Sequence, residues 1–244
     1  METQGVRIPI VRMSDGVAFE VPGSGLLPLR HIIGIGRNYA EHAKEQAADV
    51  PDRPMVFTKN IMAACLNGDE IVVPKVCQDR DQVDWEAELA VVIGRAARDV
   101  SVERAISHVL GYCCANDVSA RWWQKEGSGG QFCRGKSFDT FCPMGPFIVP
   151  AASVPDPQGL AVRCRVNGEL MQDGHTRDMI FSVSRLVSDL SQGTTLLPGT
   201  VILTGTPSGV GMARKPPVWL RDGDSVEVEI EGIGMLRNRV VFER

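Results

Sequence analysis

Alternating hydrophobic and polar positions divide most of this chain into short β-strands. Side chains of a strand point in turn to its two faces, so this alternation predicts sheets with a buried face. The clearest single signal is the Asn167-Gly168 pair, which predicts a tight hairpin turn. Strands or hairpins are predicted within 6–30, 31–36, 86–94, 136–150, 160–174, 200–211 and 224–242.

Helical periodicity is confined to a few segments. These are 38–48, 102–117 (leading into a short strand), 118–126 and 177–193. Asn38 and Glu41 have the spacing of an N-terminal capping box, and Gly193 is placed to end the last helix. Many strands, few helices and no regular β-α-β alternation predict an α+β, mainly β roll rather than a doubly wound sheet.

The chain reads as one continuous domain over residues 1–244, with 1–30 as a short N-terminal strand region. It contains no repeat, no low-complexity segment and no long linker, and 244 residues are enough to bury a substantial core.

Composition excludes several classes of function. The net charge is −4 and no run of Lys and Arg reaches five residues, which argues against a nucleic-acid partner. No apolar run approaches the ~18 residues of a membrane helix, and the N-terminal residues lack a signal-peptide pattern, so we expect a cytoplasmic protein with no membrane partner. The seven cysteines contain no C-x-x-C pair and are expected to be reduced and mostly buried.

The stretch "VDWEAELAVVIG" (83–94) places three carboxylates, Asp84, Glu86 and Glu88, at every second position along one edge before an apolar strand. Glu86 and Glu88 would lie on one face, roughly 6–7 Å apart at Cα. Their repulsion is about 3 kcal/mol at ~5 Å and an effective dielectric near 20. Either the face is solvated or a cation lies between the two carboxylates. The four histidines lie far from any paired cysteines, which excludes a zinc site, and oxygen ligands point to Mg²⁺, Mn²⁺ or Ca²⁺.

Asp117, in "ANDVSARWWQ", can be read in two ways. It is either a helix N-cap or a third carboxylate of the same cluster. Two glutamates and one aspartate would leave room for about three water or substrate oxygens around an octahedral Mg²⁺, which is the open arrangement that metal catalysis requires.

Two further groups carry candidate chemistry. His42 and Glu45 have an i,i+3 spacing, which would let the glutamate orient the imidazole and activate a water; a plain surface pair is the alternative. Arg121 and Gln124 share a helical face, and Lys136 is expected in a glycine-flanked loop, "CRGKSFD". These groups suit an anionic substrate with a carboxylate beside an oxo group, unless they are only solvated helix charges.

The glycine-rich turns "GIGRNY" (34–39) and "GTPSGVG" (205–211) do not indicate nucleotide binding. The first lacks the third glycine of a dinucleotide fingerprint, and the second lacks the Gly-Lys-Ser/Thr of a phosphate-binding loop.

Six motifs in order resemble the fumarylacetoacetate hydrolase superfamily over about residues 31–241. They are "GRNYAEHAKE", "DWEAELAVVIG", "GYCCANDVSARWWQ", "GKSFDTFCPMGP", "NGELMQDGHTRDMIF" and "ILTGTPSGVG" followed by "KPPVWLRDGDSVEVEIEGIGMLRN". About thirty residues precede the first motif, as in the short branch of acylpyruvate hydrolases and oxaloacetate decarboxylases or tautomerases.

The resemblance implies the family's mixed β-roll with flanking helices, a homodimer, and a role for each candidate residue. Mg²⁺ or Mn²⁺ would be bound by Glu86, Glu88 and Asp117. The water-activating dyad would be His42 and Glu45, with Lys136 as a third catalytic residue, and substrate would be bound by Arg121, Gln124 and Thr206. Departures from the family pattern, at "FTKN" (57–60) and at Arg37, concern the pocket rim and hence the substrate.

The expected function is metal-dependent hydrolysis of the C–C bond of acylpyruvates, yielding pyruvate and a carboxylic acid. The partner would be a small anionic 2-oxo acid that chelates the cation, with enolate charge stabilised by the metal and by Lys136. Oxaloacetate decarboxylation or keto–enol tautomerisation uses the same first step and is the alternative. A ureidoglycolate-type lyase and a non-catalytic, metal-stabilised module are further alternatives.

Overall fold

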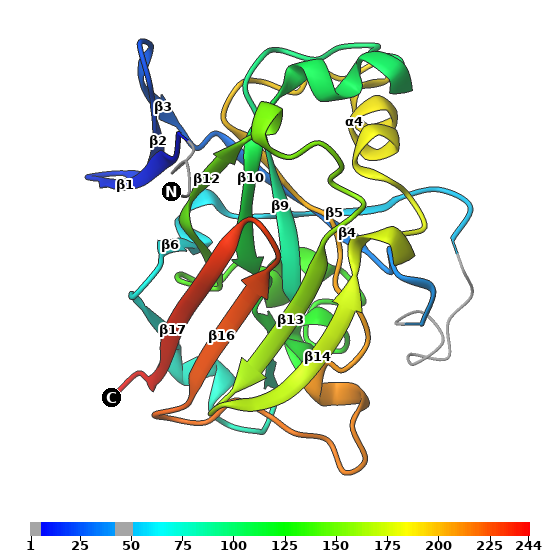
Figure 1. Cartoon of the computed structure of the whole chain (residues 1–244). Helices are drawn as coiled ribbons and strands as arrows, with labels where there is room; N and C mark the ends of the chain where they lie inside the picture. The colour runs from blue at the N-terminus through cyan, green and yellow to red at the C-terminus, as the bar shows by residue number, and fades with distance from the viewer. Residues whose placement is uncertain (1–5, 42–50) are drawn as a thin grey trace.

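The computed structural model describes residues 6–41 and 51–244, and short strands dominate it (Figure 1). The strands are β1 (Ile8–Met13), β2 (Gly16–Val21), β3 (Gly25–Pro28), β4 (His31–Gly36), β5 (Met55–Lys59), β6 (Ala64–Leu66), β7 (Glu70–Val73), β8 (Val83–Asp84), β9 (Ala87–Ile93), β10 (Val109–Asn116), β11 (Ser119–Ala120), β12 (Cys142–Pro150), β13 (Ala161–Val166), β14 (Glu169–His175), β15 (Thr200–Leu203), β16 (Ser225–Ile230) and β17 (Gly234–Phe242). The larger sheet has the order β3-β2-β1-β12-β10-β9-β15-β4-β5, with β6 beside β12. The smaller sheet has the order β14-β13-β16-β17-β7, and β8 pairs with β11.

The centre of the larger sheet is buried on both faces. Every residue of β9 and of β15 is buried, and so is nearly all of β10. Continuous apolar runs such as the last five residues of β9 suit strands that are covered on both sides. Glu88 lies within β9 and is 1% exposed, so the solvated strand face considered from the sequence is excluded.

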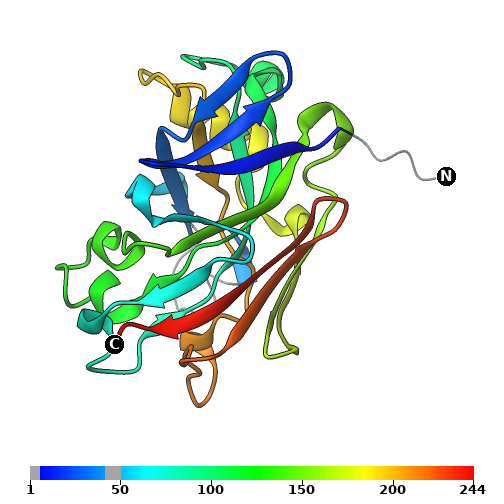
Figure 2. The ribbon, with the colours of Figure 1, turned by 90° about the vertical axis from the view of Figure 1, so that its left-hand side faces the viewer.

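The smaller sheet covers one face of the larger one (Figure 2). Its strands β13 and β16 alternate strictly between buried and half-buried positions, which turns one face toward the core. From that face Val162 and Val228 join the same apolar cluster as Leu89 and Val91 of β9. The hairpin of β13 and β14 turns at Asn167 and Gly168, both at positive φ, as the Asn-Gly pair predicted.

Helices are few and short in the described part of the chain. They are α2 (Arg121–Gln124), α3 (Phe132–Lys136) and α4 (Val183–Ser191), with 3₁₀ turns η1 (Ile61–Ala63), η2 (Lys75–Cys77), η3 (Val102–His108), η4 (Ala151–Ser153), η5 (Thr176–Asp178) and η6 (Gly211–Ala213). The hydroxyl of Ser182 accepts the Arg185 N–H at 3.3 Å and starts α4. Gly193, at φ 66°, follows its end as predicted, although the helix begins later than residue 177.

Three local predictions need correction. The helix predicted within 102–117 is only the 3₁₀ segment η3, and the short strand predicted after it is the longer β10, because residues 109–116 are buried between neighbouring strands, which overrides local helical periodicity. Helix within 118–126 is limited to α2. Asn38 does not act as the predicted N-cap, because its side chain bonds to Phe181 and Thr204; the predicted helix itself is not tested, since residues 42–48 lie outside the described residues.

The predicted fold class is confirmed: the chain is a mainly β, mixed roll with few helices. All seven cysteines are free thiols, six of them buried and Cys133 exposed, as expected. No helix in the described ranges is long and apolar enough to cross a membrane.

Candidate active site

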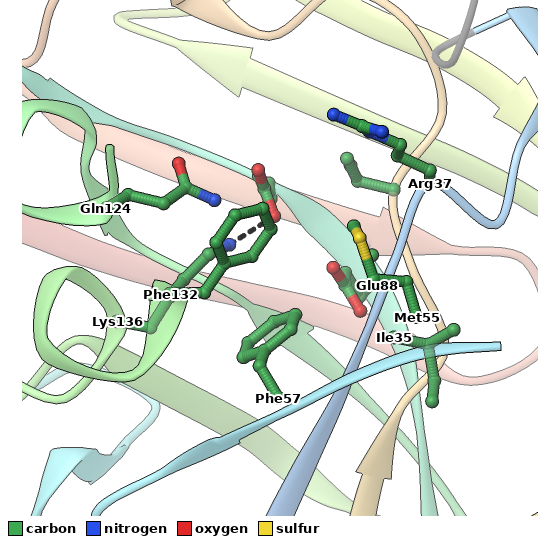
Figure 3. A pocket seen from close by; sticks show the side chains of 11 residues that line it. Ile35, Arg37, Met55, Phe57, Glu88, Gln124, Phe132 and Lys136 are labelled. Atoms are coloured by element: carbon green, nitrogen blue, oxygen red, sulfur yellow. Dashed lines mark hydrogen bonds and ion pairs between the residues drawn. The ribbon is translucent and has the colours of Figure 1, made fainter. Parts of the chain in front are cut away.

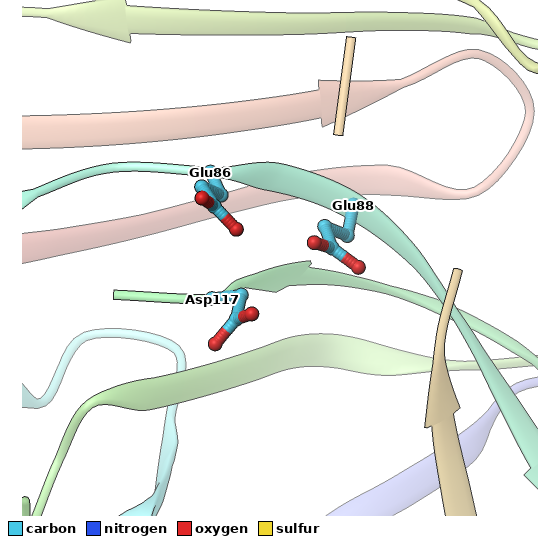
Figure 4. A group of neighbouring side chains, drawn as sticks. All are labelled: Glu86, Glu88 and Asp117. Carbon is cyan, nitrogen blue, oxygen red and sulfur yellow. The ribbon is translucent and has the colours of Figure 1, made fainter. Parts of the chain in front are cut away.

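Three buried carboxylates meet where β9 begins and β10 ends (Figure 4). The two strands are antiparallel, with Asn116 opposite Ala87, so Asp117 comes next to Glu86 and Glu88. One oxygen from each of these three carboxylates lies within 4.8 Å of the others. They are therefore placed to hold a divalent cation, and an all-carboxylate donor set fits a hard cation such as Mg²⁺ or Mn²⁺.

Two hydrogen bonds from backbone N–H groups hold the junction between the start of β9 and the end of β10. The Asp117 N–H donates to the Glu86 carbonyl at 2.9 Å, and the Glu86 N–H donates to the Asn116 side-chain oxygen at 3.0 Å. Glu86 and Asp117 lie just outside their strands, where these two bonds replace the ladder and hold both side chains toward the same space.

Two buried lysines neutralise part of the carboxylate charge. Lys136 Nζ lies 2.6 Å from both Glu86 Oε2 and Asp117 Oδ2 (Figure 3 draws the side chain beside the pocket). Lys59 Nζ pairs with the other oxygen of Asp117 and donates to the Val118 carbonyl at 3.3 Å. The alternative that Asp117 is a helix N-cap is therefore wrong, since its carboxylate pairs with the ammonium groups of Lys59 and Lys136.

Lys136 is the last residue of α3, not part of a loop as its flanking sequence suggested. Gly135 lets α3 approach α2, because a Cβ at this position would lie 2.4 Å from the Gln124 nitrogen. The close approach brings Lys136 of one helix and Gln124 of the other to the same pocket.

Arg121 and Gln124 share a face of α2, as predicted. Arg121 Nη1 lies 2.7 Å from Glu86 Oε1 and donates to Gln124 Oε1 at 3.0 Å, and its Nε donates to Asp84 Oδ2 at 2.8 Å. Among the described residues Arg121 is not part of the pocket lining, whereas Gln124 is.

Asp84 does not lie on the face that the alternation predicted it to share with Glu86 and Glu88. Its carboxylate accepts the N–H groups of Gly211 at 2.7 Å and Met212 at 3.1 Å in addition to Arg121. The reason is that Trp85 and Glu86 separate the short strand β8 from β9, so the two-residue period breaks between them.

The Gly-Thr-Pro turn after β15 closes the other side of the cluster. The Gly205 N–H donates to Glu88 Oε2 at 2.6 Å. The Thr206 hydroxyl donates to the Ala87 carbonyl at 2.9 Å and accepts from Gln172 Nε2 at 2.8 Å. Thr206 lines the pocket, with both of these bonds directed into the surrounding framework.

Charge and burial shape the ionisation of the cluster. Burial, together with Asp117 and Glu86, raises the pKa of Glu88 well above its ordinary value. Burial opposes the charge of Lys136, but Asp117 and Glu86 outweigh it and raise the pKa of that ammonium. The carboxylates of Asp84, Glu86, Glu88 and Asp117 face the cations Lys59, Lys136 and Arg121, so these seven groups leave one formal negative charge.

A small pocket opens onto the carboxylates (Figure 3). One side is polar, with Gln124 and Lys136, and another is apolar, with Phe57, Phe132 and Met55. A small anion placed here would meet the cluster at one end and aromatic rings at its flank. The lining residues are Ile35, Gly36, Arg37, Met55, Phe57, Glu86, Glu88, Gln124, Phe132, Lys136 and Thr206.

The structure thus brings together seven of the nine predicted site residues. His42 and Glu45, the remaining two, lie outside the described residues. Sequence reasoning assigned no role to Lys59 or Asp84. In "VFTK" a two-residue strand period places Phe57 and Lys59 on one face, which is the signal that could have found Lys59.

Comparison with known proteins defines the class of protein first. The family model described as "Fumarylacetoacetate (FAA) hydrolase C-terminal" matches residues 31–241. The chain therefore belongs to the fumarylacetoacetate hydrolase family, which confirms the resemblance drawn from the six motifs.

Two individual relatives give a more specific comparison than the family model does. "Oxaloacetate tautomerase FAHD2A, mitochondrial" of Homo sapiens is 48% identical over 210 residues, covering 86% of this chain and 66% of the relative. "Oxaloacetate tautomerase YisK" of Bacillus subtilis is 47% identical over 215 residues, covering 87% of this chain and 70% of the relative. This chain thus spans slightly less than two thirds of the length of the human protein.

Solved structures agree with the fold. Fumarylacetoacetate hydrolase from Exiguobacterium antarcticum is 36% identical with a TM-score of 0.82, covering 97% of this chain and 99% of that one. Fumarylpyruvate hydrolase from Pseudomonas aeruginosa, solved with Mn²⁺ and pyruvate, is 32% identical with a TM-score of 0.83, covering 96% of this chain and 99% of that one.

The expectation of an acylpyruvate hydrolase is wrong. Relatives at 47–48% identity are oxaloacetate tautomerases, whereas the fumarylpyruvate hydrolase is only 32% identical. The physical reason for the error is that both reactions begin with the same chelation of a 2-oxo acid. The carboxylate and lysine motifs were expected to serve that shared step, so they could not distinguish the steps that follow it.

Proposed function

We propose that this protein interconverts the enol and keto forms of oxaloacetate, with Mg²⁺ or Mn²⁺ held by Glu86, Glu88 and Asp117. The observation that carries the proposal is a buried carboxylate triad, bridged by Lys136 at a small pocket, in a chain 47–48% identical to oxaloacetate tautomerases. Tautomerisation moves one proton between C3 and the 2-oxo oxygen, consumes no water and breaks no carbon–carbon bond.

A bound divalent cation would supply Lewis-acid stabilisation of negative charge on the 2-oxo oxygen. It would also add two positive charges to this cluster of carboxylates and cations, which favours an anionic substrate.

Lys136 has one donor left for the substrate. An ammonium group has three N–H bonds, and two are directed at Glu86 and Asp117. Because Lys136 also lines the pocket, the third can donate to the oxygen on which negative charge develops.

Gln124 presents a donor as well. Its Oε1 accepts from Arg121, so its NH₂ group is the end that remains for the pocket (Figure 3). We assign the amide to a carboxylate oxygen of the substrate. Arg121, by contrast, positions Gln124 and Glu86 from behind.

His42 and Glu45 remain the proposed pair for proton transfer at C3. Their i,i+3 spacing and the family motif "GRNYAEHAKE" support this role. A single catalytic domain and a homodimer likewise stay predictions from the sequence, and light scattering at twice the 26.5 kDa chain mass would establish the dimer.

The test follows the ultraviolet absorbance of the oxaloacetate enol after it is added in excess over its equilibrium fraction. With Mg²⁺, the wild-type protein should speed the decay, and a chelator should return it to the uncatalysed rate. CO₂ release is measured in the same samples. Decay of the enol without CO₂ supports the proposal; CO₂ release at the rate of enol loss, or no acceleration at all, contradicts it.

A further inference from the structure

Arg37 lines the pocket from the turn that follows β4. In Figure 3 it lies across the pocket from Lys136 and Phe57. Its backbone has φ 56°, in the left-handed region that few non-glycine residues adopt. Residues in such sparsely populated conformations persist where the surrounding structure holds them, and they cluster at binding sites.

The neighbouring residue holds Arg37 in place. The Asn38 side chain donates to the Phe181 and Thr204 carbonyls at 3.0 and 2.7 Å and accepts the Phe181 N–H at 2.8 Å. Asn38 is fully buried, so three bonds anchor the turn directly after Arg37. These bonds hold the backbone of the turn from which Arg37 enters the pocket lining.

Arg37 differs from the other cations around the pocket in its partners. Lys59, Lys136 and Arg121 are all paired with carboxylates of the cluster. In residues 6–41 and 51–244, by contrast, Arg37 has no ion pair, and its buried Nε atom has no hydrogen-bond acceptor. A buried guanidinium donor without an acceptor is costly unless a ligand supplies one.

We propose that Arg37 determines specificity by binding the substrate carboxylate that is remote from the 2-oxo group. This inference rests on the proposed function, in which the other carboxylate and the 2-oxo oxygen face Glu86, Glu88 and Asp117. The remote carboxylate of a four-carbon dicarboxylic acid must then be met elsewhere in the pocket. A guanidinium fork matches a carboxylate in shape and charge, which the aromatic flank of the pocket cannot do.

The test separates the two ends of the substrate. Oxalate carries the paired oxygens of the chelating end and no remote carboxylate, whereas oxaloacetate carries both ends. The variants are Arg37→Met, which keeps the length of the stem, Arg37→Lys, which keeps the charge, and the matched control Arg98→Met. Arg98 is an exposed arginine beyond the opposite end of β9 from Glu88.

Arg37→Met should raise the KM for oxaloacetate roughly 10- to 100-fold, the effect of losing a charged hydrogen bond. The dissociation constant of oxalate with Mg²⁺, measured by calorimetry, should change less than about twofold. Arg37→Lys should recover part of the KM, and Arg98→Met should match the wild type.

An unchanged oxaloacetate KM in Arg37→Met, with an active wild type, overturns the inference. A parallel loss of oxalate affinity overturns it too, because the residue would then serve the chelating end or the fold. If Arg37→Met does not fold, the oxaloacetate KM and the oxalate dissociation constant of Arg37→Lys decide. The inference then requires that the KM rises while the dissociation constant stays unchanged. Failure of the proposed function looks different, since the wild type itself would then leave oxaloacetate enol unchanged.

Discussion

The carboxylate of Asp84 holds the guanidinium of Arg121, with its Oδ2 atom 2.8 Å from Nε and 2.7 Å from Nη2. The same carboxylate accepts the N–H groups of Gly211 and Met212, so it ties α2 to the loop after β15. Arg121 in turn contacts Glu86, which makes Asp84 the support beneath one carboxylate of the triad.

Asp84→Asn should destabilise the fold by about 3–5 kcal/mol, because the buried guanidinium of Arg121 would lose the negative charge of one carboxylate partner. Chemical denaturation measures this change. Asp81→Asn is the matched control, since Asp81 pairs with Arg221 at half-exposed positions and surface pairs contribute only about 0–1 kcal/mol. Equal losses in the two variants would contradict a special role for Asp84.

Mg²⁺ or Mn²⁺ should raise the melting temperature of the wild type and a chelator should reverse the rise. A ligand at 100 times its dissociation constant stabilises the native state by about 2.7 kcal/mol. Glu88→Gln should lose the shift, because it removes one charged oxygen donor from the triad. Glu169→Gln, an exposed glutamate at the start of β14, should keep it. A metal-induced shift of wild-type size in Glu88→Gln would show that the cation binds elsewhere.

Lys136→Met should lower kcat for tautomerisation by roughly 10²–10³-fold, the usual effect of losing a donor to developing charge. The variant also leaves Glu86 and Asp117 facing each other without the bridging ammonium. Its stability should therefore depend more strongly on Mg²⁺ than that of the wild type. Enzyme kinetics and melting curves with and without Mg²⁺ check both effects.

The control for that experiment is Lys125→Met, at an exposed position directly after α2. It should behave as the wild type in both measurements. A Lys136→Met variant with normal kcat would remove the lysine from the proposed chemistry even if its stability changed.

His42→Ala should reduce tautomerisation by roughly 10²–10⁴-fold, as expected for loss of a general base. The Mg²⁺-induced rise in melting temperature should persist, because the carboxylate triad is intact. His108→Ala serves as the matched control; that histidine lies in η3, where its Nδ1 contacts the Ala96 carbonyl at 2.9 Å. Loss of the metal response together with activity would mean that His42 acts on the triad rather than on the substrate.

Short-range chemistry explains what the sequence by itself determined. The Asn167-Gly168 hairpin follows from two residues that tolerate positive φ, and it forms as predicted. Glu86 and Glu88 meet at one site, as their two-residue spacing predicted, although Glu86 itself lies just outside β9. The six motifs in order were enough to identify the family, because the residue spacing within each motif is visible in the sequence itself.

Tertiary contacts decided the rest. Residues 109–116 became a central strand because neighbours on both sides supply hydrogen bonds and cover the side chains, which no local periodicity reports. Lys59 reaches Asp117 across 58 positions of sequence, and Asp84 reaches Gly211 across 127. Such partners depend on how strands and turns pack together, so their roles as supports of the carboxylate triad emerge only in the folded chain.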